Sequence, residues 1–300
     1  MKLNKIKNSI LLTILFILIL ISGCQSKNVK FSFSGRKVLY SDQFQGNRVL
    51  ILLNLDTKEE LLFDDFDEVE RSDFILYNDG KNIFVDSYNA TGKVFIYGVV
   101  KKSETEIDYQ SYGIANFNNV KIFNNNFYFA SQKNINSYSL SDLKLIREYN
   151  ADSLIAQFEV YNEDLFAVNY SIYDDEHNGI RPSSIYIKDF KNKSSKEIPY
   201  LALLYDLSLD KQKLLFNSRG PKIMYYPSLV VHPIDAIEKD SLEIYSWMRF
   251  VGKDELIFAG FKKGKDPYES TNLYLLHLVT NKIERITNSK TVKEIKSTIY

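Results

Sequence analysis

A repeat of short apolar runs is the feature that most constrains how this chain folds. Runs of about six residues rich in Leu, Ile, Phe and Tyr, each bounded by polar turns, are typical of β-strands. The first run of each repeating unit begins 38 to 49 residues after the previous one. The six first runs are KVLYSD (Lys37–Asp42), NIFVDS (Asn82–Ser87), NFYFAS (Asn126–Ser131), DLFAVN (Asp164–Asn169), KLLFNS (Lys213–Ser218) and ELIFAG (Glu255–Gly260).

Each unit also contains a second apolar run, and most contain a third strand and a short inner stretch. The second runs are Leu50–Leu55, Val94–Val99, Ile135–Leu140, Ile185–Phe190, Leu229–Ile234 and Leu273–Leu278. Four strands in about 44 residues, repeated six times, predict an all-β fold: a six-bladed β-propeller of four-stranded antiparallel blades. A lone blade leaves both faces apolar, so stacking in a ring buries them. A β-sandwich or two stacked all-β domains remain as alternatives, although neither requires a constant period.

The repeat also predicts the domain boundaries. We expect one propeller domain over residues 31–300, with blades at approximately 31–65, 66–113, 114–150, 151–199, 200–244 and 245–290. Residues 292–300 have strand character and are interpreted as a closing strand that pairs with the first blade; a frayed tail is the alternative.

Three stretches carry a resemblance to a known repeat: Phe31–Tyr40, Leu76–Phe84 and Leu207–Phe216. They resemble the repeat of TolB-like, WD40-like β-propellers, in which a short strand ends in Ser-Pro-Asp-Gly and is followed by Lys and an apolar strand. The proline is missing throughout, and the third and fourth units have diverged. The resemblance implies a fold and leaves the function open.

The first 24 residues have the features of a targeting segment. Lys2, Lys5 and Lys7 precede the apolar stretch Ile10–Ile21, whose twelve residues are too few to cross a bilayer of about 30 Å comfortably. The following Ile-Ser-Gly-Cys sequence resembles the bacterial lipobox. The resemblance implies cleavage after Gly23, a diacylglyceryl group on Cys24 and acylation of the new amino terminus, for example by palmitate. Residues 24–30 would form a tether, and the alternative is an uncleaved anchor.

The expected location follows from that segment: a lipid-anchored protein on the cell membrane, exposed outside the cytoplasm, facing the periplasm or at the cell surface. The chain from Cys24 onward has 35 basic and 38 acidic residues, so no basic excess indicates a nucleic-acid partner. Cys24 is the only cysteine, so no intrachain disulfide stabilises the domain.

The connections between the second and third strands are unequal in length along the chain. In the last three units they are long, at residues 170–184, 219–228 and 261–272. We expect these connections to form one recognition rim, because aromatic and arginine side chains on loops of a rigid scaffold often bind partners; plain solvated hairpin tips are the alternative. The expected partner-binding residues are Tyr170, Tyr173, Asp175, His177, Arg181, Arg219, Tyr225, Tyr226, Lys263 and Tyr268.

Catalytic and metal motifs are scarce. The three histidines fall in different units, and no zincin, nucleophile-elbow, P-loop or Rossmann pattern occurs. Asp174–Gly179 has oxygen ligands at alternate positions, as a calcium loop does, but the twelfth position is Ile185 instead of Glu. We therefore expect no metal, no cofactor beyond the covalent lipid, and a non-enzymatic platform for a protein or cell-envelope component. The alternative is a surface glycan-binding or glycan-processing protein that uses the centre of the ring.

Overall fold

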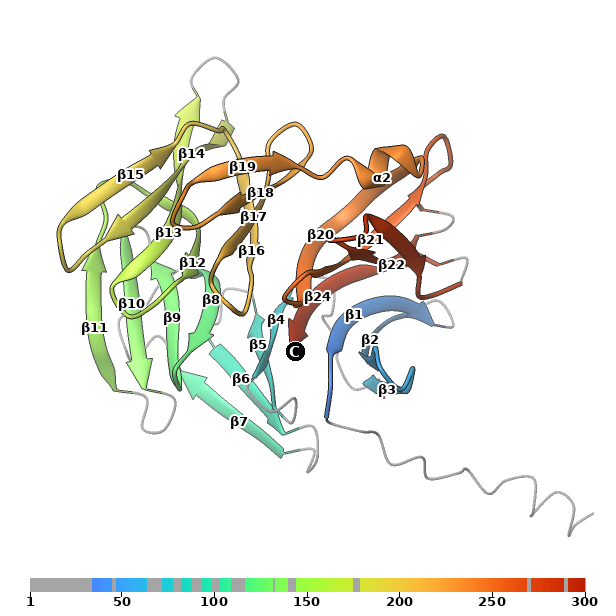
Figure 1. Ribbon diagram of the computed structural model, residues 1–300. Coiled ribbons are helices and arrows are strands. Elements are labelled where there is room, and N and C mark those ends of the chain that lie inside the picture. The colour runs from blue at the N-terminus through green and yellow to red at the C-terminus, as the bar shows by residue number, and fades with distance from the viewer. Residues whose placement is uncertain are drawn as a thin grey trace, which may run out of the picture. The chain divides into compact units, whose positions relative to one another are not determined.

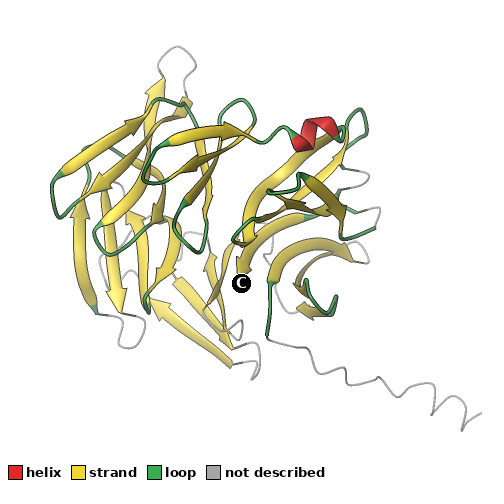
Figure 2. Ribbon diagram, in the orientation of Figure 1, coloured by secondary structure: helices red, strands yellow, loops and turns green. Residues whose placement is uncertain are grey.

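The structure is a computed structural model, and it describes residues 34–44, 47–63, 72–77, 82–87, 93–98, 103–108, 117–131, 133–139, 144–174, 179–268, 271–288 and 291–299. Cys24 and the expected targeting segment lie outside these residues, so both stay predictions. Among the described residues, no helix is long and apolar enough to span a membrane. Strands dominate the described part of the chain (Figure 2), with one short helix, α2 (Ala236–Lys239).

The strands form six four-stranded antiparallel sheets. The first sheet contains β1 (Lys37–Phe44), β2 (Asn47–Asn54), β3 (Glu60–Phe63) and β24 (Glu294–Ile299). The next two contain β4 (Ser72–Tyr77), β5 (Asn82–Ser87), β6 (Lys93–Gly98), β7 (Ser103–Asp108), and β8 (Phe117–Phe123), β9 (Asn126–Ser131), β10 (Asn134–Ser139), β11 (Leu145–Asn150).

The remaining three sheets lie in the second half of the chain. They contain β12 (Ile155–Val160), β13 (Leu165–Asp174), β14 (Gly179–Asp189), β15 (Ser194–Ile198); β16 (Leu203–Leu207), β17 (Lys213–Asn217), β18 (Pro221–Tyr225), β19 (Val230–Pro233); and β20 (Leu242–Gly252), β21 (Glu255–Lys262), β22 (Asn272–His277), β23 (Lys282–Arg285).

The expected six-bladed propeller is wrong in its number of blades. Five blades, rather than six, are built from four consecutive strands: β4–β7, β8–β11, β12–β15, β16–β19 and β20–β23. The other sheet, which we call the composite sheet, has the order β24–β1–β2–β3, so its inner strand comes from the opposite end of the chain (Figure 1). The physical reason is that β24 occupies the hydrogen-bonding edge of β1, where a strand before Lys37 was expected. The closing-strand interpretation of the C-terminal stretch is confirmed.

The inner strands contact one another in a closed series. β24 contacts β4 and β20, β8 contacts β4 and β12, and β16 contacts β12 and β20. Apolar side chains fill the spaces between neighbouring sheets. One such core joins the composite sheet to blade β20–β23 through Val38, Tyr40, Val251, Ile257 and Ile295, all nearly inaccessible to solvent. This closed series of sheets, with apolar cores between neighbouring sheets in the described part of the chain, is the arrangement of a β-propeller.

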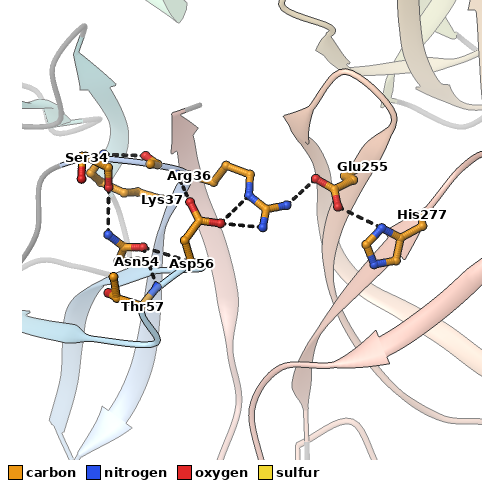
Figure 3. A network of polar contacts seen from close by, with 9 residues as sticks. Ser34, Arg36, Lys37, Asn54, Asp56, Thr57, Glu255 and His277 are labelled. Atoms are coloured by element: carbon orange, nitrogen blue, oxygen red, sulfur yellow. Dashed lines mark hydrogen bonds and ion pairs between the residues drawn. The ribbon is translucent and has the colours of Figure 1, made fainter.

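A polar network also links the composite sheet to blade β20–β23 (Figure 3). The Arg36 guanidinium donates to the Asp56 carboxylate, with Nε–Oδ1 and Nη2–Oδ1 distances of 2.8 and 2.6 Å, and pairs through Nη1 with Glu255. Glu255 Oε1 lies 2.9 Å from Nδ1 of His277 on the adjacent strand β22. The network therefore ties the start of β1 to the blade that precedes the closing strand.

Hydrogen bonds from side chains hold the turn between the first and second strands of a blade. In blade β16–β19 the backbone N–H of Lys213 donates to Ser208 Oγ at 2.9 Å, and Ser208 Oγ donates to Asp210 at 2.6 Å. Lys211 adopts a φ of 58°, and Gly35 adopts a φ of 80° in the composite sheet. Such left-handed conformations favour glycine. Lys211 therefore has a backbone conformation that residues with a side chain rarely adopt.

Candidate functional site

A cavity of about 430 Å³ lies at one end of blade β20–β23. The start of β20 and the end of β21 are paired there, as Leu242 lies opposite Lys262. The start of β22 and the end of β23 meet at the same end, where Tyr274 lies opposite Arg285. The cavity is lined by Asp240, Leu242, Lys262, Lys265, Asn272, Tyr274, Ile283 and Arg285. We call this set the blade-end pocket.

The floor of the blade-end pocket is apolar. Leu242 and Tyr274 are 5% and 6% exposed and belong to the core cluster that joins this blade to blade β16–β19, and Ile283 packs against the same cluster. The Tyr274 ring stacks on Phe258, with ring centroids 5.5 Å apart. Burial raises the pKa of the Tyr274 phenol, while the nearby charge of Arg285 opposes that shift. The phenol is therefore neutral at physiological pH.

The rim of the blade-end pocket is cationic. Lys262, Lys265 and Arg285 are exposed, and they outnumber the single carboxylate, Asp240. The ammonium of Lys262 donates to the backbone carbonyl of Asp240 at 3.0 Å. Arg285 donates from Nε to the carbonyl of Thr287 at 2.9 Å. Because these acceptors are neutral backbone groups, the rim keeps its positive charge available for an anionic group.

The connection between β21 and β22 contributes Lys265 to the pocket and also carries two predicted rim residues, Lys263 and Tyr268. A turn at Gly264 (φ 79°), in which the N–H of Lys265 donates to the carbonyl of Lys262 at 3.0 Å, places Lys263 between two pocket residues. Tyr268, further along the same connection, is 73% exposed. Its ring meets Tyr245 edge-on, with ring centroids 6.2 Å apart. An exposed aromatic residue therefore lies on the same connection as Lys265 of the cationic rim.

Arg219 lies on the corresponding connection of the neighbouring blade, and three other predicted residues do not share this location. Arg219 is exposed in the turn between β17 and β18. Tyr225 is the last residue of β18 and Tyr226 follows it, so both lie at the opposite end of this strand from Arg219. Tyr225 pairs there with Lys213 at the start of β17. The Tyr226 ring packs 4.9 Å from that of Tyr161. Tyr170 is only 6% exposed, so it belongs to the core.

The remaining predicted residues lie on the β13–β14 hairpin. Tyr173 pairs with Ile180, and Arg181 pairs with Ile172, so this stretch is a long strand pair instead of the expected loop. The side chains of Tyr173 and Arg181, and both Asp175 and His177, lie outside the described residues, as does most of the possible calcium loop. Among the described residues, no cluster of His, Cys, Asp or Glu has the arrangement of a metal site.

Sequence reasoning missed six members of the blade-end pocket: Asp240, Leu242, Asn272, Tyr274, Ile283 and Arg285. Lys262 and Lys265 lie within the long connection at residues 261–272, which the sequence did indicate. The pocket is assembled by strand register, which joins positions 20 residues apart in one pair and 11 in the other. The one available signal was the apolar Ile283 between the charged Lys282 and Glu284, a local alternation of the kind found in strands with one solvent-exposed face.

Comparison with solved structures gives the same fold. A structure described as a nidogen/laminin complex matches with a TM-score of 0.59 and 8% identity, covering 88% of this chain and 98% of that chain. At this identity the likeness shows the fold alone. This chain has a β-propeller fold. No protein-family model matches the sequence, and no curated protein matches it.

Two further solved structures align less well. One is dihydro-heme d1 dehydrogenase NirN in complex with DHE, with a TM-score of 0.42, 14% identity and coverage of 84% of this chain; the alignment spans only 54% of that protein. The other is a structural genomics protein of unknown function from Bacteroides thetaiotaomicron, with a TM-score of 0.44, 10% identity and coverage of 76% of this chain and 65% of that one. Neither supports an argument about function.

Proposed function

We propose that this chain is a membrane-anchored lipoprotein, exposed outside the cytoplasm, whose TolB-like propeller is a non-enzymatic binding platform. The partner is a protein or cell-envelope component that presents an anionic group to the blade-end pocket. One observation carries the proposal: three exposed cations line a pocket with an apolar floor, and the 73% exposed ring of Tyr268 lies on the same connection as one of them, Lys265. Exposed aromatic and cationic side chains at one place are typical of interface hot spots.

The anchor half of the proposal rests on Cys24 and the apolar stretch before it. A diacylglyceryl group with a further acyl chain supplies about 0.8 kcal/mol per buried methylene, which holds a protein stably at a membrane. Metabolic labelling with a palmitate analogue tests this directly. We expect label and membrane association in the wild type and loss of both in Cys24→Ala. Membrane retention of the unlabelled variant would show an uncleaved anchor instead.

The platform half is tested by changing the pocket without changing the fold. The variant Lys262→Gln/Lys265→Gln/Tyr268→Ala removes two rim charges and the exposed ring. Its matched control is Lys253→Gln/Lys282→Gln, which removes two exposed lysines from the other end of the same blade. Each lipid-anchored version of the protein is used as bait: it is crosslinked to neighbouring molecules in membranes and then recovered with whatever is bound to it.

We expect the wild type and the control to recover one stoichiometric partner and the pocket variant to lose it. Recovery should fall by about tenfold or more, because each hot-spot truncation costs at least about 1–2 kcal/mol. Equal recovery by the pocket variant and the control would refute the blade-end pocket as the recognition site.

A further inference from the structure

Four successive inner strands each contribute one charged side chain near the centre of the ring. β8, β12, β16 and β20 carry Lys121, Glu159, Asp206 and Arg249, respectively. Three of these residues occupy equivalent positions in their sheets. Each pairs with the third residue of the repeat run on the next strand: Lys121 with Tyr128, Asp206 with Leu215, and Arg249 with Ile257. With Lys211, from the turn after β16, they form what we call the inner-strand charge cluster.

Each carboxylate in the inner-strand charge cluster already has a cation. Lys121 forms an ion pair with Glu159, which is only 6% exposed. Arg249 Nη1 lies 3.8 Å from Asp206 Oδ1 and donates to the carbonyl of Tyr205 at 2.9 Å. Asp206 Oδ2 also accepts the backbone N–H of Phe250 at 2.7 Å. The two acidic groups are therefore satisfied within the protein.

The cationic side of the cluster is not satisfied. The Lys211 ammonium lies 5.2 Å from the centre of the Phe123 ring, and among the described residues it has no hydrogen-bond acceptor or ion-pair partner. Burial lowers the pKa of this ammonium group; the charges of Glu159 and Asp206 oppose that shift, and the charge of Lys121 adds to it. Arg249 Nε is likewise buried without an acceptor in the described part of the chain. Two donors thus remain open.

Lys211 combines two local costs. Its φ of 58° is a conformation that non-glycine residues rarely adopt. Partial burial of an ammonium group without a direct hydrogen-bond or ion-pair partner is unfavourable as well, and the contact with an aromatic ring offsets only part of this. A strained backbone and a partly buried ammonium without a direct partner, found at one residue, are characteristic of functional sites, where a ligand supplies the missing interaction.

The charge balance of the cluster indicates the kind of ligand. Three cations, Lys121, Lys211 and Arg249, face two carboxylates, which leaves one positive charge in excess. A monoanion neutralises that excess, whereas a dianion would be repelled by the two carboxylates. The side chains of Lys121 and Arg249 keep 21% of their surface exposed, so the cluster is reached from solvent.

We propose that the inner-strand charge cluster binds a carboxylate-bearing ligand, whose carboxylate pairs with the Lys211 ammonium. This site is separate from the blade-end pocket and does not depend on the function proposed for it. Nothing in the cluster requires covalent chemistry: binding consists of an ion pair and hydrogen bonds at donors that are otherwise open.

The test uses the full chain with ¹³C-methylated lysines and follows the signal that Lys211→Met removes. Acetate is titrated as the probe, with acetamide as its neutral isostere and chloride as an unspecific anion. We expect a saturable shift of the Lys211 signal with acetate and none with acetamide. Lys239→Met, at an exposed helical lysine, should leave acetate binding unchanged.

A second variant separates binding from folding. Lys211→Gln keeps a polar side chain, and its urea midpoint shows whether it folds. In the folded variant, acetate affinity, followed by chemical shifts of the Lys121 signal, should fall by about tenfold or more. The proposal is overturned if acetate shifts the Lys211 signal no more than acetamide or chloride does, or if Lys211→Gln binds acetate as the wild type does.

Discussion

Replacing Ile295 by Ala is the sharpest test of how the ring closes. Ile295 lies on β24, is 1% exposed, and packs in the core that joins the composite sheet to blade β20–β23. Truncating a fully buried Ile to Ala costs about 2–5 kcal/mol, because the apolar transfer energy is lost and a cavity remains. The total stability of a domain is about 5–15 kcal/mol. We therefore expect Ile295→Ala to remove a large fraction of it.

The assay is equilibrium unfolding in urea, followed by the fluorescence of Trp247 and by far-UV circular dichroism. Trp247 is the only tryptophan and lies on β20, which contacts β24. The control is Val279→Ala, at a 78% exposed turn residue, which should change the stability by no more than about 0.5 kcal/mol. A loss below about 1 kcal/mol for Ile295→Ala would refute the role of β24 as part of the core, since a frayed tail would tolerate the change.

Two further predictions concern the turn and the polar network at the start of β1. Gly35→Ala should lower stability more than Gly264→Ala. Both glycines have φ near 80°, but an added Cβ at Gly35 would lie 2.4 Å from the Asp56 carboxylate, whereas nothing lies within 4 Å at Gly264. Equal urea midpoints for the two variants would contradict the packing at Gly35. Hydrogen bonding to Arg36 holds the pKa of Asp56 below its ordinary 3.8, so its contribution to stability is present above that pH and is lost as the pH falls through the lowered pKa. Arg36→Ala should flatten this acid limb in urea titrations across acidic pH, and an unchanged slope would show that the pair contributes nothing.

The second strand of each sheet, counted from the ring centre, was the most predictable part of the fold. The first runs of the repeat coincide with strands because they are short, apolar and bounded by polar turns, as in β5 (NIFVDS) and β9 (NFYFAS). These properties are local, so they can be recognised in the sequence without knowing which strands pair with one another. The closing strand EIKSTI was also recognisable by its apolar residues.

The outer strands and the way the sheets share strands were harder to predict. The third strand of blade β16–β19 is Pro221–Tyr225, whereas the more apolar LVVHPI contributes the outer strand β19. A run that begins with Pro and Lys does not look like a strand, yet the partner β17 pairs with all five of its residues. The difference between six contiguous blades and five is set by β24 pairing with β1, which joins the two ends of the chain and leaves no local signal.

The candidate sites show the same division between local and long-range information. Lys263 and Tyr268 were predictable because they lie on a polar connection. The pocket residues on the strands were not predictable, because strand register alone brings them together. The composition also gives no indication of these local positive charges, because the 38 basic and 38 acidic residues of the chain cancel. The blade-end pocket nevertheless has three cations and one carboxylate, and the inner-strand charge cluster has three cations and two carboxylates. Since an anionic ligand responds to the field of nearby charges more than to distant, screened ones, a neutral chain carries two places that favour anions, and strand pairing fixes both.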